Sequence, residues 1–353
     1  MTSGTVSAMR EYSSGEPRLQ FAMLLCTQHP VDVSMAVAVR EKVEQVRLAR
    51  ELGFDMVVTG QHFLSSPFQE LQSVPMLARL AAEAGEMKLG TSILLLALLN
   101  PVEVAEQIAT LDVITEGRLR FGVGLGYRDV ELAAFGISRK DRVTRLEQNL
   151  QVVTRLLAGT TASLDTPHCR LDDAALTLRP VQKPHPPIWM GANSDAAVRR
   201  AARLADTWIL NPHARLDTLT RQVEEVYRPA LAEVGKPMPE HLPLRREVYV
   251  AEDRISAIRE AAPWLFPKYQ VYADWGQDKA LPTGDDFDGD FDELIKDRFI
   301  LGSPEDCIAE IDRCRDRLGM TELIVRVQWP GMPQKQAMKN IERIGTTLIP
   351  HYR

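Results

Sequence analysis

The stretch FGVGLGYRDV, residues 121–130, decides between two kinds of α/β fold. Its three glycines alternate after an apolar run, as they do at the start of a dinucleotide-binding turn. That turn requires the pattern GxGxxG, however, and Tyr127 stands where the third glycine belongs. The stretch also forms the fourth strand–helix unit of the chain, and no acidic residue stands at the expected position on a second strand. We therefore reject a Rossmann turn.

Alternate glycines along one strand leave one face of that strand without side chains. The empty face has two explanations, which are tight packing inside a barrel and close approach of a flat ligand ring. The glycines lie at the carboxyl end of the strand, and this position slightly favours a ligand.

On both sides of this strand in the sequence, short apolar segments alternate with amphipathic helices. The eight predicted strands cover 19–26, 54–62, 88–96, 119–126, 186–193, 207–212, 246–252 and 321–328. Near-continuous apolar strands between helices indicate a parallel sheet covered by those helices. Eight such units predict an α/β fold of the (β/α)8 TIM barrel type with insertions, as a single domain over 18–353. An open doubly wound sheet is the alternative.

Composition excludes several classes of function. The net charge of -6 provides no basic face for a nucleic acid. The polar residues 1–17, which we expect to form a flexible tail, lack the apolar core of a secretory signal, and no apolar run is long enough to span a membrane. The four cysteines show no metal-binding or disulfide spacing, so we expect a cytoplasmic protein without a metal site.

Two segments interrupt the alternation of strands and helices. Residues 160–186 are expected to form a small hairpin, and residues 272–298 form a long acidic insertion. A calcium loop read from Asp286 fails, because Phe291 replaces the required glycine and Asp297 the required glutamate. Long loops within compact domains are commonly lids, so we predict a lid at about 272–298.

A phosphate site is predicted where the fifth strand meets the next helix. Gly191, Ala192, Asn193 and Ser194 place small residues and free backbone N–H groups at a helix N-terminus, which suits an anion. A plain helix cap by Ser194 explains the same residues equally well. His62 and His213 follow the second and sixth strands, where a histidine can bind a cofactor or carry a proton.

Four longer stretches together resemble the bacterial luciferase-like family of flavin-dependent oxidoreductases. They are ELGFDMVVTGQHF (51–63), NPVEVAEQIATLDVITEGRLRFGVGLGYRDVELAAFG (100–136), LRPVQKPHPPIWMGANSDAAVRRAARLADTWI (178–209) and GSPEDCIAEIDRCRDRLGMTELIVRVQWPG (302–331). The resemblance implies a (β/α)8 barrel that holds a reduced flavin at the carboxyl ends of its strands.

The resemblance also implies a role for individual residues. The flavin phosphate would bind at Gly191–Asn193 with Ser194, and the flavin ring would lie along Thr91, Ser92 and the turn from Gly124 through Gly126 to Tyr127. The expected catalytic residues are His62 and His213, as proton carriers, and Tyr127, as a hydrogen-bond donor. Met23 and Trp329 are expected to line an apolar substrate pocket.

From the resemblance we expect a monooxygenase that uses reduced FMN and O2, through a flavin hydroperoxide, on a small hydrophobic substrate. A separate flavin reductase would supply the reduced FMN, and the enzyme would be a homodimer. The alternatives are a dehydrogenase that transfers hydride to or from a deazaflavin, and a flavin-binding protein without catalysis.

Overall fold

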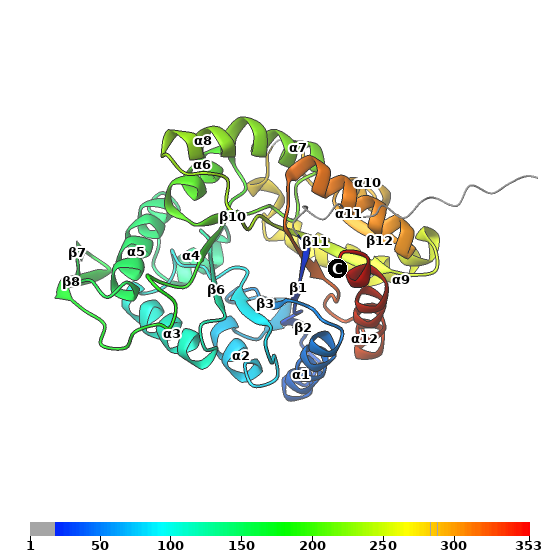
Figure 1. Ribbon diagram of the computed structural model, residues 1–353, viewed down its shortest axis with the longest axis horizontal. Coiled ribbons are helices and arrows are strands. Elements are labelled where there is room, and N and C mark those ends of the chain that lie inside the picture. The colour runs from blue at the N-terminus through cyan, green and yellow to red at the C-terminus, as the bar shows by residue number, and fades with distance from the viewer. Residues whose placement is uncertain (1–17, 283, 288) are drawn as a thin grey trace, which may run out of the picture.

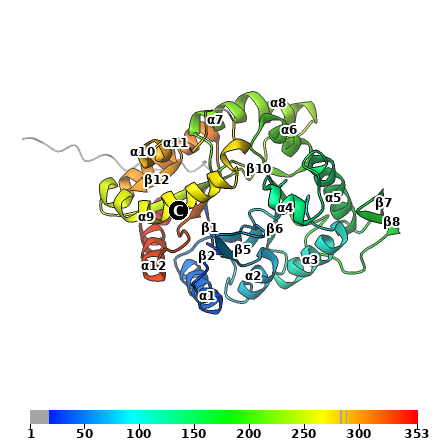
Figure 2. The ribbon, with the colours of Figure 1, turned by 180° about the vertical axis from the view of Figure 1, so that it is seen from behind.

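A curled parallel sheet surrounded by helices forms the centre of the protein (Figures 1 and 2). The computed structural model describes residues 18–282, 284–287 and 289–353, so the predicted tail at 1–17 lies outside the described residues. The nine strands lie in the order β10-β9-β6-β5-β3-β1-β13-β11-β12, and neighbours in this order are parallel. They are β1 (Gln20–Leu24), β3 (Met56–Thr59), β5 (Lys88–Thr91), β6 (Leu119–Val123), β9 (Ile188–Gly191), β10 (Thr207–Ile209), β11 (Pro243–Val250), β12 (Phe299–Gly302) and β13 (Glu322–Arg326).

The predicted TIM barrel is correct in its parallel strands and alternating helices but wrong in its closure. The sheet is a half-barrel whose edges are β10 and β12, and a single parallel bridge, Leu210–Leu244, links the end of β10 to β11. The long strand β11 explains this geometry. Its first part pairs with β13, and its second part, from Glu247 onward, pairs with the unpredicted strand β12. Only the start of β11 is therefore left to approach β10.

Helices cover the outer face of the sheet, as both ribbon views show. They are α1 (Met35–Glu51), α2 (Ser73–Leu80), α3 (Pro101–Ile114), α4 (Asp129–Ala134), α5 (Arg142–Leu157), α6 (Asp195–Leu204), α7 (Leu216–Arg221), η1 (Gln222–Tyr227), α8 (Arg228–Glu233), α9 (Arg254–Asp274), η2 (Asp278–Ala280), α10 (Phe291–Ile295), α11 (Pro304–Leu318), α12 (Gln334–Arg343), η3 (Ile344–Leu348) and α13 (Ile349–His351). Local sequence sets several of their starts. Asn100 caps α3 by accepting hydrogen bonds from two backbone N–H groups, and Ser303 with Asp306 forms a capping box on α11. Within the described part of the chain, no helix combines the length and apolar character that crossing a membrane requires.

Two small antiparallel pairs of strands lie outside the main sheet. The predicted hairpin within 160–186 is confirmed as β7 (Ala162–Thr166) paired with β8 (Cys169–Ala174), and it projects beyond α5 and α3 (Figure 1). A two-stranded antiparallel ladder of β2 (Gln28–Pro30) with β4 (Phe68–Glu70), between which α1 and β3 intervene in the sequence, was not predicted. Because it pairs Gln28 with Glu70, it brings two polar side chains together near the carboxyl ends of β1 and β3.

Side chains alternate between the two faces of each strand and so divide the core. On β1, Phe21 and Met23 belong to the large outer cluster beneath the helices, whereas Ala22 and Leu24 belong to a smaller inner cluster. The inner cluster consists of Ala22, Leu24, Met56, Val58, Trp189, Ile209 and Ile324, with Ile93 packed against it. These side chains fill the inside of the half-barrel, which leaves space for a ligand only at the ends of the strands.

Candidate functional site

A cavity of about 710 Å³ opens at the carboxyl ends of the strands. Its wall is formed by residues at or after the ends of β1, β3, β5, β6, β9, β10 and β13, together with residues after α9. Ligands of barrel and open α/β proteins bind at this end of the sheet. The arrangement therefore places most of the predicted site residues around one space.

Nine of the thirteen predicted site residues line this cavity. They are His62, Ser92, Gly126, Tyr127, Gly191, Ala192, Asn193, Ser194 and His213. The other four, Met23, Thr91, Gly124 and Trp329, are absent from its wall.

Thr91 and Gly124 take part in the packing of β5 and β6, with the residues that follow them, against each other. The Thr91 hydroxyl donates to the Gly122 carbonyl at 2.7 Å and accepts from the Gly122 N–H at 2.8 Å. A Cβ atom at Gly122 would meet the Thr91 carbonyl oxygen at 1.9 Å, and one at Gly124 would meet Ile93 Cδ1 at 1.7 Å. The packing explanation is therefore correct for these two glycines, and only Gly126, with a φ of 77°, reaches the cavity.

Met23 and Trp329 lie in the core, which corrects their predicted place in a substrate pocket. Met23 is directed toward the helices because it alternates with the inward-facing Ala22 and Leu24. The Trp329 ring is buried beneath the cavity floor, where its N–H donates to Glu247 Oε2 at 2.5 Å.

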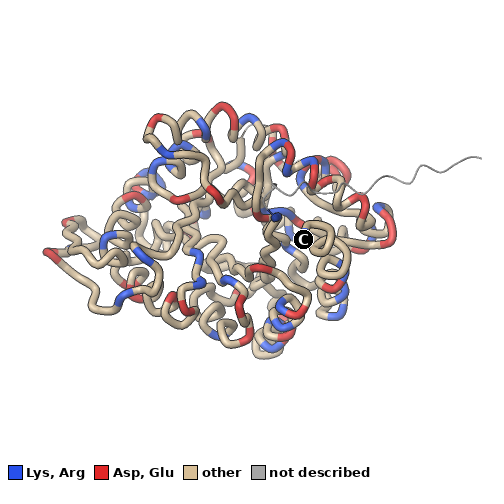
Figure 3. The backbone as a smooth tube through the Cα atoms, viewed as in Figure 1, with Lys and Arg blue, Asp and Glu red and all other residues tan. Residues whose placement is uncertain are grey.

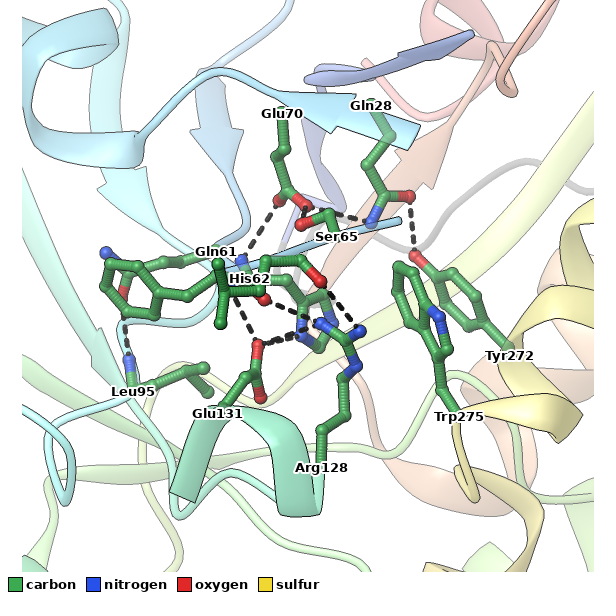
Figure 4. A network of polar contacts seen from close by, with 12 residues as sticks. Gln28, Gln61, His62, Ser65, Glu70, Leu95, Arg128, Glu131, Tyr272 and Trp275 are labelled. Atoms are coloured by element: carbon green, nitrogen blue, oxygen red, sulfur yellow. Dashed lines mark hydrogen bonds and ion pairs between the residues drawn. The ribbon is translucent and has the colours of Figure 1, made fainter. Parts of the chain in front are cut away.

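His62 is held in place by a buried carboxylate from a neighbouring helix (Figure 4). Glu131, on α4, accepts from His62 Nδ1 at 3.0 Å and from the Phe63 N–H at 2.8 Å, and Arg128 Nη1 lies 3.3 Å from the same oxygen. A hydrogen bond from Nδ1–H fixes the imidazole tautomer and leaves Nε2 as the nitrogen that can accept from a ligand. His62 therefore enters the cavity wall with a defined ring orientation.

Aromatic rings and a lid residue surround His62. Its ring centroid lies 5.7 Å from that of Tyr127, 6.3 Å from that of Tyr272 and 5.3 Å from that of Trp275. Trp275 stacks on Tyr272, receives the Arg128 guanidinium at 3.9 Å from its ring centroid and donates to the Ser66 carbonyl at 3.0 Å. These contacts attach the first part of the predicted lid to the segment after β3.

A second group of hydrogen bonds connects the backbone of His62, through Glu70 and Gln28, to the hydroxyl of Tyr272. Glu70 accepts from the His62 N–H at 3.1 Å and from Gln28 Nε2 at 3.1 Å, and Ser65 donates to it at 2.8 Å (Figure 4). Gln28 Oε1 in turn accepts from the Tyr272 hydroxyl at 2.9 Å. The unpredicted strand pair β2–β4 therefore carries two residues, Gln28 and Glu70, that hold the His62 backbone and the Tyr272 hydroxyl in place.

His213 belongs to a different and drier environment. Its Nδ1 lies 3.0 Å from the Tyr269 hydroxyl, and that hydroxyl donates to Glu247 Oε1 at 3.2 Å. Burial, and then the nearby positive charges of Lys268 and Arg245, hold the pKa of His213 well below its ordinary value. His213 is consequently a neutral imidazole that can accept a hydrogen bond or a proton, and it cannot act as an acid near pH 7.

Tyr127 is a neutral donor. Burial raises the pKa of its phenol well above the ordinary value, with further contributions from Tyr272 and Glu131. Its hydroxyl is buried and has no hydrogen-bond partner among the described residues. A buried donor without a partner is costly, so this hydroxyl is available to a ligand.

The loop between β9 and α6 has the properties of an anion site. Trp208 Nε1 donates to the Ala192 carbonyl at 3.1 Å, and Gln222 Nε2 donates to the Asn193 carbonyl at 2.8 Å. These bonds turn the carbonyl groups into the protein, whereas the first N–H groups of α6 have no intrahelical acceptor. Ser194 also caps α6, although its bond to the Ala197 N–H is long at 3.4 Å.

Arg142 completes this end of the cavity and was not predicted. It lines the cavity at the first position of α5 and donates to the Gly126 carbonyl at 3.1 Å. A cation at a helix N-terminus opposes the helix dipole, which is the signal in the sequence that could have identified it. Arg200, on α6, is instead paired with Glu147 at 2.9 Å.

Arg245 and Arg326 lie at the floor of the cavity and were also not predicted. Figure 3 shows that Lys and Arg are interspersed with Asp and Glu along the outer helices. These two arginines instead occupy strands β11 and β13, inside the half-barrel. An arginine within an apolar strand such as ELIVRVQ is the sequence signal for such a position.

Comparisons with known proteins agree with this geometry. A family model described as luciferase-like monooxygenase matches residues 19–322. The monooxygenase RslO1 from Streptomyces bottropensis is 25% identical with a TM-score of 0.81, and the match covers 95% of this chain and 100% of that one.

Two further proteins differ in their cofactors. The oxygenating constituent of 3,6-diketocamphane monooxygenase from Pseudomonas putida, solved in complex with FMN, is 18% identical with a TM-score of 0.75 over 94% of this chain and 98% of that one, which shows a shared fold alone. An F420-dependent glucose-6-phosphate dehydrogenase from Microbacterium testaceum is 29% identical over 195 residues, 54% of this chain and 57% of that protein. Since the family model matches well over half of the sequence, the chain belongs to the luciferase-like monooxygenase family, whose members are oxidoreductases.

Proposed function

We propose that the protein is a monooxygenase that uses reduced FMN and O2 to oxidise a small organic substrate. The observation that carries the proposal is the cavity itself. It combines, at one end, a phosphate-type loop with an arginine that forms no ion pair within the described ranges and, at the other, an aromatic group, and the segment after α9 forms part of its wall. Similarity to the monooxygenase RslO1 over nearly the whole of both chains supports the oxygen-dependent reaction.

The residues at the rim fit a phosphate monoester. Gly191–Ser194 offers backbone N–H groups next to the start of α6, and Arg142 adds a guanidinium. Arg142 forms no ion pair among the described residues, because the nearby Asp129 is engaged by Arg139 at 2.6 Å. A phosphate is bound well by such a combination of helix N-terminus and cation.

The middle of the cavity fits a flavin ring. Ile93 offers an apolar surface, and the hydroxyls of Ser92 and Tyr127 are buried without a partner in the described part of the chain. These two hydroxyls would satisfy polar atoms on the ring edge, and His62 Nε2 would contact the flavin or the substrate. A bound reduced flavin would supply the two electrons and the activation of O2.

The chain's own contribution is to orient the substrate, to control protons and to exclude water. His62 is positioned by Glu131, and Tyr127 remains protonated as a donor. His213 remains neutral and can accept a proton at Nε2, since Nδ1 faces Tyr269. The segment after α9, which we propose as a lid, places Trp275, Lys279 and Leu281 in the cavity wall and would keep bulk water away from the reaction.

Hydride transfer with a deazaflavin is the second candidate function. The 29% identity to an F420-dependent dehydrogenase supports it, and the rim described above would bind a phosphate of either cofactor. The separate flavin reductase and the homodimer expected from the family resemblance stay predictions, and so does a flavin-binding protein without catalysis.

An anaerobic binding titration distinguishes these functions. The protein is titrated separately with reduced FMN and reduced F420, and O2 is then admitted to each complex while flavin absorbance and H2O2 are recorded. We expect tight binding of reduced FMN and slowed reoxidation of the bound flavin. Preference for reduced F420, with a complex that does not react with O2, would overturn the monooxygenase in favour of the dehydrogenase.

A further inference from the structure

Arg245 and Arg326 form a pair of positive charges at the base of the cavity. They lie on the neighbouring strands β11 and β13, where Arg245 is in register with Ile324 and Arg326 with Glu247. Ile324 belongs to the inner cluster, so alternation along the strands places both arginines inside the half-barrel. Both side chains line the cavity.

Each arginine bonds to neutral groups. Arg245 Nη1 donates across the half-barrel to the Ser92 carbonyl at 3.2 Å. Arg326 donates to the Tyr272 hydroxyl at 3.2 Å and to Gln28 Oε1 at 3.4 Å. Within the described ranges neither forms an ion pair, and the Nε of each is buried without a hydrogen-bond acceptor.

The carboxylates of Glu247 and Glu70 already accept hydrogen bonds from other donors. Glu247 accepts from Lys268 Nζ at 2.5 Å and from Tyr269 on one oxygen, and from Trp329 on the other. Glu70 accepts from the His62 backbone, Gln28 and Ser65. Lys268 and Glu247 offset each other, and Glu70, whose donors are neutral, offsets one arginine, so these five groups keep one excess positive charge.

Such a charge excess is costly unless something neutralises it. Burying a cation removes its hydration, and two adjacent cations also repel each other. An arginine fork with unsatisfied donors matches the two oxygens of a carboxylate. The cavity is the face from which a counter-anion can arrive, because both guanidinium groups line it.

We propose that the substrate is an organic acid whose carboxylate binds Arg245 and Arg326, with its apolar part against Leu24, Ile93 and Ile209. This inference rests on the proposed function and replaces its generic small substrate with an acid. The cofactor phosphate has its own cation at Arg142, at the start of α5, whereas Arg245 and Arg326 come from β11 and β13 inside the half-barrel. The floor charge is therefore assigned to the substrate.

Paired ligands test the inference by isothermal titration calorimetry. The acids benzoate, cinnamate and hexanoate are compared with their neutral amides, in the presence and absence of reduced FMN under anaerobic conditions. We expect at least one acid to bind about tenfold more tightly than its amide, as charge-assisted recognition provides. Arg245→Gln and Arg326→Gln should each bring that ratio close to one while leaving reduced FMN affinity nearly unchanged.

Arg120→Gln is the matched control. Arg120 is also a half-buried strand arginine whose Nε has no partner among the described residues, but it does not line the cavity. This variant should keep the acid preference. Equal binding of acids and amides by the wild type, absence of binding by both, or a preference that survives both floor variants would overturn the inference.

The same experiment shows whether the two arginines bind the substrate acid or the flavin. If the floor variants lose affinity for reduced FMN while acids and amides remain indistinguishable, the charge serves the flavin ring and the inference is wrong. If the wild type binds no reduced FMN but retains an acid preference that depends on Arg245 and Arg326, the proposed cofactor is wrong and the acid site stands.

Discussion

The two ends of the cavity bind charge by different means. At the rim, the β9–α6 loop offers backbone N–H groups, and Arg142 of α5 adds a partly exposed cation. At the floor, Arg245 and Arg326 meet the cavity from within the half-barrel, with neutral partners only among the described residues. A backbone anion site costs little when it is empty because water can occupy it, whereas guanidinium groups whose buried Nε atoms lack an acceptor among the described residues gain from a ligand.

This difference teaches where the specificity of the protein lies. A loop of backbone donors suits a phosphate on many different ligands, so we propose that the rim binds the cofactor. The floor combines side chains from two strands and therefore depends on residues that can change without altering the fold. We expect variants at the rim to alter cofactor affinity and variants at the floor to alter the choice of substrate.

The largest effect is expected from Gly191→Asp at the rim. A carboxylate beside the bound phosphate would repel it by several kcal/mol, and we expect the affinity for reduced FMN to fall by about 100-fold or more. Anaerobic fluorescence titration measures this. Gly191→Asn has the same size without the charge and should lose far less, and equal losses in both variants would attribute the effect to a clash with Ile93, which lies 3.3 Å from a Cβ atom at this position.

Arg142→Gln should weaken reduced FMN binding by about tenfold, which corresponds to the loss of one charge-assisted contact of about 1.4 kcal/mol. Raising the salt concentration should reduce the wild-type affinity more than that of the variant, because the ion pair is screened. Riboflavin, which lacks the phosphate, should bind both proteins alike. A similar loss of riboflavin affinity would remove Arg142 from the phosphate site.

The buried His213 should make the free energy of unfolding depend on pH. Its folded pKa lies below the unfolded value of about 6.5, so the unfolded chain binds more protons as the pH falls through 6.5, and the folded state loses stability. His213→Gln should reduce the slope of unfolding free energy against pH, between about pH 6 and 5, by up to about 1.4 kcal/mol per pH unit. His29, whose pKa burial lowers to about 4, acts in the same direction but is present in both proteins and cancels. Urea unfolding at several pH values provides the measurement, and an unchanged slope would contradict a buried neutral His213.

The smallest of these effects is expected from Trp275→Ala in the proposed lid. The variant loses the stacking on Tyr272, the hydrogen bond to Ser66 and the contact with the Arg128 guanidinium, of which the last alone is worth about 1 kcal/mol, so the closed state should become at least about fivefold less populated. We expect more H2O2 to escape per reduced FMN oxidised, with little change in reduced FMN affinity. Unchanged H2O2 release would remove the sealing role from this segment.

The rim could be predicted from the sequence because its chemistry is continuous along the chain. Gly191–Ser194 runs from the last residue of β9 to the start of α6, and His62 lies shortly after the end of β3. The floor could not, because Arg245 and Arg326 come from strands far apart in sequence, and their pairing appears only when β11 and β13 lie side by side. The strand pair β2–β4, which brings Gln28 to Glu70, was not predicted for the same reason, because these two strands are far apart in the sequence.

Three errors arose from packing that sequence patterns do not specify. Met23 was assigned to the wrong face, because only the alternation with Ala22 and Leu24 shows which side faces inward. Gly124 has no side chain because Ile93 fills that space. Closure of the sheet was predicted from the number of strands, whereas the pairing of β11 with β12 leaves a half-barrel.

Rapid mixing with O2 tests the central claim most directly. The protein is loaded anaerobically with reduced FMN, mixed with oxygenated buffer and followed by absorbance, beside free reduced FMN at the same concentration. We predict that bound flavin returns to its oxidised spectrum more slowly than free flavin and that the delay requires an intact rim, so Gly191→Asp abolishes it. Reoxidation at the rate of free flavin, or the absence of reduced FMN binding in the wild-type protein, would contradict a reduced-FMN monooxygenase.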